Sequence, residues 1–477
     1  MKTGHTEMGF QRATAVDRRR FLKAAGAATC ACLTRFPSVA LGASAGDGLK
    51  LATFQCNATP PMGDTLIWTT PLAKVLDTLL LKGVVLEDGG KRYVLCAIDW
   101  CLLCNESERV FRETLARAVG TDSSCVSVHC VHQHTAPYAD EDAHRLLDGA
   151  GATPHLTKVF LDGLRTRMGK AAAGAMERLE PVDRVGYGAA YVDRVASQRR
   201  LKASDGKIIS RFSAGGRDPK MAEWPEGYID PQLKTVSFAR GEKVLARLHY
   251  YATHPQTHSC DGSASADFVG MAREAREREE GVFQLYFTGC AGNVTVGKYN
   301  DGTLPAREAL ARRLQNGMRT AAIATRFVPA DRIVWRKETL MLPVRADDAF
   351  VQESRRNLSD SRAEIRVYRG AMRLAAAARA GGPFAACSLQ IGQVRIVHLP
   401  GEPMLEFQTY AQSCTPDDFV AVAGYGDCAS AYVCTDQAFA EGGYEPDDSN
   451  LAAGTESLLK DAIRRLLGHG LGANDVR

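Results

Sequence analysis

The sequence is poor in long uncharged hydrophobic runs, in net charge and in histidine. A helix that crosses a membrane needs about 20 consecutive apolar residues, and the 477 residues contain no such run. The formal net charge is only +4, which gives no reason to expect nucleic acid or an acidic membrane surface as a partner. We therefore expect a soluble mature protein without a transmembrane segment and without a nucleic-acid partner.

The overall composition is that of an ordinary globular protein. Hydrophobic residues make up 45% of the chain and charged residues 24%, which excludes a fibrous or disordered protein. A chain of this length can bury a large core, in one domain or in two.

The N-terminus has the pattern of an export signal. Arg18 to Arg20 precede Phe21 to Lys23, an Ala-rich stretch follows, and Ala43 to Ala45 offer a small-residue cleavage site. We interpret residues 1–45 as a twin-arginine signal, read by the twin-arginine export machinery. The alternative is an ordinary basic helix start. The signal predicts a periplasmic or secreted protein, and its route carries proteins that are already folded, often with a cofactor.

Cysteine is common, with 14 residues, two of them inside the expected signal. Export permits disulfides, but several cysteines lie in apolar segments where a thiol packs as a small hydrophobic group. The spacing Cys101-x-x-Cys104 is compatible with a zinc or redox site. No second pair stands at zinc-finger spacing, so packing is the favoured interpretation.

Strand-like and helix-like segments alternate after the signal and predict an α/β fold. Residues 92–99 form an apolar, strand-like run, residues 107–120 have helical spacing, and residues 125–132 form a second strand. In open α/β sheets, sites form at the carboxyl ends of such strands. We expect one catalytic domain over residues 46–477, with a helical surface insertion at about 347–382.

Five polar motifs follow predicted strands. They are HQHTAP from residue 132, HPQTH from 254, CAGNVTVG from 290, PGEPM from 400, and AYVCTDQAF with GGYEP between 431 and 446. Residues i and i+2 of a strand face the same side, so His132 and His134 would share one cavity and His129 would face away. Each motif alone fits a satisfied core histidine or a solvated turn equally well. Together they supply two imidazoles and a carboxylate, a common ligand set of catalytic zinc.

This ordered set of motifs resembles the neutral ceramidase family, zinc amidases that cleave the amide of N-acylated sphingoid bases. The resemblance extends over roughly residues 50–465. It implies a mixed α/β, sandwich-like catalytic domain with a metal site at its strand ends. The chain leaves no room for the C-terminal immunoglobulin-like domain typical of that family.

The resemblance also implies a ligand set for Zn²⁺. His132 and His254 match the two zinc histidines, and Glu402 matches the carboxylate ligand. The tyrosine ligand falls on Tyr432, because YVCT stands where the family has YVTT, and Tyr444 remains a rival.

Two further roles follow from the same resemblance. His134 matches the histidine that faces the substrate and would move a proton, first as base and then as acid. Gly292, Asn293 and Thr295 match the substrate-binding loop, but Asn293 stands where the family has Asp, and Thr295 where it has Ser. These departures leave the exact substrate open.

The expected function is that of an exported zinc-dependent amidohydrolase, which hydrolyses an N-acyl amide of a small molecule or ceramide-like lipid with a zinc-activated water. One alternative is a hydrolase of the same fold that acts on another amide or ester, in cell-wall or carbohydrate substrates. Another is a non-catalytic binding homologue. A thiol hydrolase that uses Cys130 or Cys290 is disfavoured, because neither has a clear histidine partner.

Overall fold

The computed structural model describes residues 48–360 and 364–469. All of these residues belong to one unit. The expected export signal, residues 1–45, lies outside the described residues. Within the described ranges, no helix combines the length and apolar character that a membrane span requires.

The first sheet has the strand order β6-β4-β3-β1-β8. Its strands are β1 Lys50–Asn57, β3 Leu80–Asp88, β4 Lys91–Ile98, β6 Val126–Cys130 and β8 Glu180–Pro181. β4 and β6 are parallel and are connected through α1 (Asn105–Val119), so the predicted β-α-β unit is confirmed. α1 ends at Gly120, whose positive φ of 68° closes the helix.

The second sheet has the order β16-β14-β13-β9-β18. Its strands are β9 Arg184–Tyr191, β13 Gln232–Arg240, β14 Lys243–Tyr251, β16 Phe283–Thr288 and β18 Arg326–Pro329. β13 and β14 form the antiparallel hairpin that the sequence predicts. β14 and β16 are parallel, and α5 (Asp267–Glu280) lies between them in the chain. β14 ends at Tyr251, three residues before His254.

The third sheet has the order β19-β20-β21-β23. Its strands are β19 Val334–Leu340, β20 Phe384–Ile391, β21 Val394–His398 and β23 Phe419–Ala423. The segment 347–382, expected to be helical, contains α7 (Asp348–Leu358) and α8 (Glu364–Ala378). The sequence places this segment between β19 and β20.

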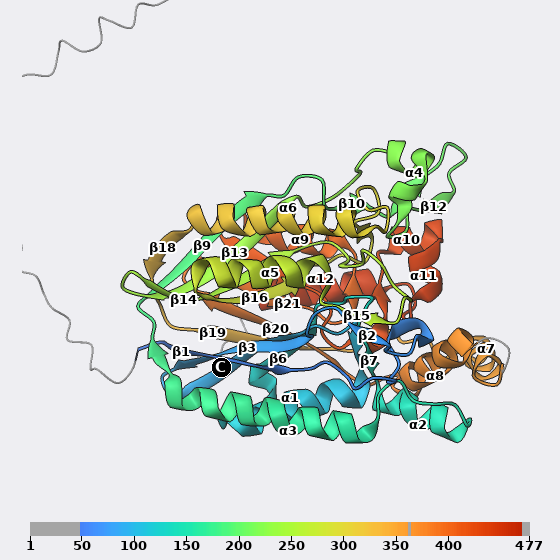
Figure 1. Ribbon diagram of the computed structural model, residues 1–477, viewed down its shortest axis with the longest axis horizontal. Coiled ribbons are helices and arrows are strands. Elements are labelled where there is room, and N and C mark those ends of the chain that lie inside the picture. The colour runs from blue at the N-terminus through green and yellow to red at the C-terminus, as the bar shows by residue number, and fades with distance from the viewer. Residues whose placement is uncertain (1–47, 361–363, 470–477) are drawn as a thin grey trace, which may run out of the picture. The chain divides into compact units, whose positions relative to one another are not determined.

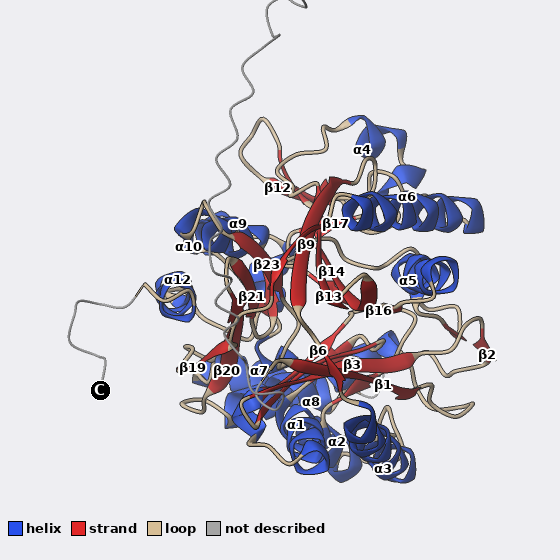
Figure 2. Ribbon diagram, turned by 90° about the vertical axis from the view of Figure 1, so that its left-hand side faces the viewer, coloured by secondary structure: helices blue, strands red, loops and turns tan. Residues whose placement is uncertain are grey.

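The core lies between sheets that are covered by helices on their outer sides. α1 and α3 (Lys158–Ala175) lie along the first sheet, and α5 and α6 (Leu304–Ile323) lie over the second (Figure 1). Figure 2 shows α9 (Leu405–Cys414) and α12 (Thr455–Leu466) beside the third sheet. The remaining helices are α2 Glu141–Gly149, α4 Pro219–Glu223, α10 Asp436–Glu441 and α11 Tyr444–Asp448. This arrangement confirms the mixed α/β, sandwich-like class.

Short two-stranded ladders hold the loops between the long strands. They pair β2 Lys74–Val75 with β15 Ser263–Ala264, β5 Leu102–Leu103 with β7 Tyr138–Ala139, β10 Ser197–Gln198 with β17 Val294–Thr295, β11 Arg200–Lys202 with β12 Ile208–Ser210, and β22 Glu402–Pro403 with β24 Tyr432–Val433. The first, second, third and last of these ladders involve residues close to the sequence motifs. They fix loops that would otherwise lack backbone hydrogen bonds.

The turn before Glu402 requires glycine, which gives a testable prediction for stability. Gly401 has a φ of +69°, and a Cβ there would lie 2.1 Å from Ser430 Oγ. Gly392 has a φ of +56°, with no other described atom within 4 Å of an added Cβ. Gly392→Ala should lower the free energy of unfolding by about 1–2 kcal/mol, the cost of left-handed backbone. Gly401→Ala should cost about 1–3 kcal/mol more because of the overlap. Urea denaturation measures both, and equal losses would contradict the expectation.

Candidate metal centre

The two histidines of the HQH motif share a cavity, but not for the reason that the sequence suggests. β6 ends at Cys130, and His132 has a positive φ of 76°. An extended strand therefore does not align His132 with His134, and the argument from strand alternation is wrong. A sharp turn does so instead, while Gln133 between them donates a hydrogen bond to Asp99 Oδ1 at 3.2 Å. His129 is on the strand and faces another cavity, as expected.

Three predicted ligands meet at one point although they come from distant parts of the chain. His132 follows β6, His254 follows β14, and Glu402 lies in β22. Glu402 Oε2 is 3.2 Å from His132 Nε2 and 3.3 Å from His254 Nε2. One ligand atom from each of the three lies within 4.8 Å of the others, and all three side chains are buried.

Backbone carbonyls determine which nitrogen of each histidine carries the proton. His132 Nδ1 lies 2.8 Å from the carbonyl oxygen of Cys101. His254 Nδ1 lies 2.7 Å from that of Ala291 and 3.0 Å from that of Val294. A carbonyl oxygen only accepts, so both Nδ1 atoms must be donors. The other ring nitrogen of each, Nε2, faces Glu402.

Two buried acceptors consequently face each other at the centre. Burial lowers the pKa of His254 to about 4, so its ring is neutral at pH 7. Its short contact with Glu402 is then a contact between lone pairs. His254 Nε2 and Glu402 Oε2 both lack a hydrogen-bond partner among the described residues. Buried acceptors that face one another are costly unless a cation lies between them. The donor set therefore fits a metal ion, with second-sphere carbonyls that orient its histidines.

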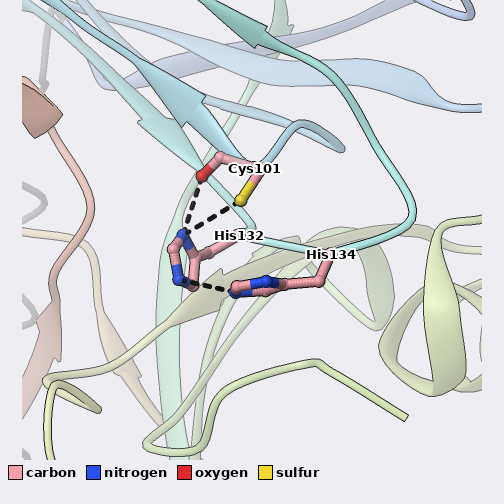
Figure 3. A group of neighbouring side chains, drawn as sticks. All are labelled: Cys101, His132 and His134. Carbon is pink, nitrogen blue, oxygen red and sulfur yellow. Dashed lines mark hydrogen bonds between the residues drawn. The ribbon is translucent and has the colours of Figure 1, made fainter. Parts of the chain in front are cut away.

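His134 has the opposite proton arrangement. The indole Nε1 of Trp68, which can only donate, lies 3.3 Å from His134 Nδ1. Nδ1 therefore accepts, and the neutral ring carries its proton on Nε2. His134 Nε2 lies 3.3 Å from His132 Nε2 (Figure 3). Burial lowers the pKa of His134 well below its ordinary value. His134 is thus a hydrogen-bond donor beside the metal ligands.

Cys101 also approaches His132 but on the other side of the ring. Its Sγ is 3.9 Å from His132 Nδ1, the nitrogen that donates to the Cys101 carbonyl oxygen (Figure 3). Cys101, His132 and His134 form a second possible ligand group. Burial raises the pKa of the Cys101 thiol well above its ordinary value, and Cys101 and Cys104 are both free thiols. We therefore favour the group that contains Glu402.

The two candidate tyrosines lie one behind the other. Tyr432 is the residue in register with Glu402 in the β22–β24 ladder. Its ring stacks at 6.4 Å on the ring of His254, and the ring of Tyr444 follows at 5.7 Å. The guanidinium of Arg199 lies 5.0 Å from the Tyr432 ring and 5.3 Å from the Tyr444 ring. Tyr432 is therefore the tyrosine closer to the histidine, and its role as a ligand stays a prediction.

The loop predicted to bind substrate packs behind the centre in this structure. A Cβ on Gly292 would lie 2.6 Å from the Glu402 carbonyl oxygen. Asn293 accepts from the amide of Leu405 at 2.8 Å and donates to Glu406 at 2.9 Å. An aspartate at position 293 would face the Glu406 carboxylate and be repelled by it. This is a local physical reason for asparagine at the position where the resemblance leads one to expect aspartate. The carbonyl oxygen of Thr295 accepts a hydrogen bond from the Ser197 hydroxyl.

None of these three loop residues is among those that line the pocket at the metal group. That pocket is lined by Ile67, Trp68, Cys101, Leu102, His132, His134, Arg369, Met372, Arg373, Glu402, Ala431, Tyr432, Tyr444, Asp448 and Asn450. The loop instead supplies the carbonyl groups that hold His254. Its predicted contact with substrate remains a prediction.

Sequence reasoning missed two aromatic residues of the site. Tyr425 has a positive φ of 65°, and its ring stacks on that of His132 at 4.4 Å. The Gly-Tyr-Gly sequence around it signals an unusual turn. Trp68 lies in a 3-10 turn, Ile67–Thr69, where it also has a positive φ of 65°. It lies 66 residues before His134, and no motif marks it.

Comparison with known proteins gives one consistent answer at the level of the fold. No family model and no curated protein sequence matches the chain. A crystal structure of neutral ceramidase from Pseudomonas aeruginosa superposes with a TM-score of 0.65 at 15% identity, covering 90% of this chain and 76% of that one. A structure of a ceramidase complexed with C2 superposes with a TM-score of 0.64 at 15% identity, covering 90% of this chain and 77% of that one. The described chain therefore has the fold of the neutral ceramidases, as the sequence motifs predict.

Proposed function

We propose that this protein is an exported zinc-dependent amidohydrolase that cleaves the N-acyl amide of a ceramide-like substrate. The observation that carries the proposal is the meeting of His132, His254 and Glu402 in one buried group, in which His254 Nε2 and Glu402 Oε2 have no hydrogen-bond partner among the described residues. The ceramidase fold of the neighbouring structures supports the reaction class. Zn²⁺ suits a site of two imidazoles and a carboxylate, with Tyr432 as the fourth protein ligand.

Zn²⁺ held by these residues would supply a Lewis acid that polarises the amide carbonyl and makes water nucleophilic near neutral pH. The chain itself contributes orientation and proton transfer. His132 and His254 are fixed by the carbonyls of Cys101 and Ala291. Trp68 and Tyr432 line the pocket beside the metal group.

His134 would act first as a donor. Because Trp68 occupies Nδ1, the Nε2–H of His134 is available to the carbonyl oxygen as negative charge develops there. The leaving nitrogen also needs a proton so that the amine departs neutral, and the attacking water is its source. His134 would carry this proton by accepting it first, as the family resemblance implies, and then releasing one to the nitrogen, so that the ring ends neutral. Because Nε2 already holds a proton at rest, this relay requires the contact of Nδ1 with Trp68 to open, and the resting tautomer itself favours the donor role of His134 at the carbonyl oxygen.

Metal content tests the ligand set. Protein purified without added metal should contain about one zinc per chain. His254→Ala and Glu402→Gln should each lower the zinc content to a small fraction, as measured by mass spectrometry of the metal. His258→Ala is the matched control, because His258 belongs to the same motif but contacts Ser263 and Asp261 instead. Metal-free wild-type protein, or full zinc in His254→Ala, would overturn the ligand assignment.

The role of His134 is tested by turnover. His134→Asn should keep the zinc and lower kcat by about 10²–10⁴-fold, because proton transfer is lost. Trp68→Phe keeps the ring but removes the Nε1–H, and should lower kcat by about 10-fold. Product analysis with ceramide, short N-acyl amines and acetylated sugars measures both the rate and the bond cleaved. Unchanged turnover of His134→Asn would rule out this role, and cleavage of sugar esters alone would rule out the amidase.

Export is tested at the N-terminus, outside the described residues. Replacement of Arg18 and Arg19 together by lysine should leave the precursor in the cytoplasm, because the twin-arginine receptor reads the arginine pair. Cell fractionation measures the distribution. The matched control is Lys23→Arg, which should not change export. Equal export of the double variant would exclude the twin-arginine route.

A further inference from the structure

We propose that the natural substrate carries an acidic group on the amine side of its scissile amide, bound by Arg369 and Arg373 of α8. This inference rests on the proposed amidohydrolase function and narrows its substrate class. It concerns a wall of the pocket that the family motifs do not include. The acidic group would be a carboxylate, sulfonate or phosphate, and the simplest such substrate is an N-acyl amino acid.

α8 brings two arginines to the pocket that contains the metal group. Arg369 and Arg373 are four residues apart and therefore lie on the same face of the helix. Both line the pocket together with His132, His134 and Glu402.

α8 is held in a fixed position. Val367, Ala371 and Ala375 are buried in the core, and the Tyr368 hydroxyl donates to the Thr153 carbonyl. The arginines are thus presented by a rigid element.

The pocket has more positive than negative charge outside the metal group. Its charged lining residues there are Arg369, Arg373 and Asp448. Asp448 forms ion pairs with both arginines. Its Oδ2 lies 3.2 Å from Arg369 Nη2, and its Oδ1 lies 3.7 Å from Arg373 Nη2. The other acid near Arg373 is Glu353, at 3.6 Å, whose side chain is 53% exposed and does not line the pocket. One carboxylate facing two guanidinium groups leaves a positive charge for an anion.

The position of this charge assigns it to the amine side of the amide. The guanidinium of Arg369 lies 5.2 Å from the centre of the Trp68 ring. Trp68 in turn donates to His134, the residue that would protonate the leaving nitrogen. An anion on Arg369 is therefore separated from His134 by one indole ring. Since His134 would protonate the leaving nitrogen, we assign the acidic group to the half of the substrate next to His134, which is the amine half.

With a neutral amine half, Asp448 would be the one carboxylate in the described pocket lining that faces the two guanidinium groups. A substrate carboxylate bound in bidentate fashion would supply a second. Asp448 holds the two side chains in place before the substrate enters. The arrangement thus favours acidic amides over their neutral analogues.

The test compares three substrates with the same acyl chain on the zinc-loaded enzyme. N-dodecanoylglycine and N-dodecanoyltaurine are acidic, and N-dodecanoylethanolamine is a neutral analogue of similar size. Wild-type kcat/KM should be at least about 10-fold higher for an acidic amide than for the ethanolamide. The glycine and taurine arms distinguish a carboxylate from a sulfonate.

Arg369→Met keeps the aliphatic length and removes the charge. It should lower kcat/KM for the acidic amide by about 10-fold or more and change that of the ethanolamide by less than about 2-fold. Arg366→Met is the matched control on the same helix, because Arg366 is exposed, pairs with Asp360 and does not line the pocket. It should leave both substrates unchanged. Calorimetric binding of N-dodecanoylglycine to His134→Asn, with and without Arg369→Met, gives a second readout that does not depend on turnover.

The outcomes separate this inference from the function on which it rests. Equal rates for acidic and neutral amides, or an equal loss for both in Arg369→Met, would overturn the acidic substrate and leave the amidase intact. If no amide, including ceramide, is cleaved by the zinc-loaded protein, the proposed function fails and the inference fails with it. A selective loss for the acidic amide supports both.

Discussion

The Nδ1 protons of His132 and His254 are both held by backbone carbonyls, and the rest of the site depends on that constraint. If either ring could turn its proton inward, it would donate to Glu402 and satisfy the carboxylate without a metal. The carbonyls exclude that arrangement, because they accept hydrogen bonds and cannot donate them. His254 Nε2 and Glu402 Oε2 are then left without a donor among the described residues. A cation between them would satisfy both, so this buried polar cluster fits a metal centre.

The backbone at the centre is bent in ways that ordinary side chains resist. His132, Tyr425 and Gly401 all have positive φ values, and each such non-glycine residue costs of order 1–3 kcal/mol. The surrounding structure offsets this cost through backbone bonds that link the loops to one another. The Cys130 amide donates to the Tyr425 carbonyl, and the Tyr425 amide donates to the Gly401 carbonyl. The ring of Tyr425 then supports His132 from one side.

Two fully buried histidines of this core, His249 and His254, differ in their hydrogen-bond partners. His249 is buried between Thr235 and Gln284, which bond to its two ring nitrogens. It therefore needs no ion. His254 is equally buried, but its Nε2 has no such partner among the described residues. Two ring partners thus make His249 a structural histidine, whereas the unpartnered Nε2 of His254 beside Glu402 makes it a candidate metal ligand.

The sequence by itself determined the α/β class, the β-α-β unit and the motifs that meet at the centre, because hydrophobic periodicity and residue type are local properties. The sequence motifs also resemble those of the neutral ceramidases, and the comparison of folds finds the same likeness. Only the tertiary structure decided the local geometry of the site. The turn at His132, the donor Trp68, and the packing of Asn293 against Glu406 depend on contacts between residues far apart in the chain. Proton positions depend on those contacts too: the motifs could give His132 and His134 separate roles, but only the fold shows which nitrogen of each ring meets a donor or an acceptor.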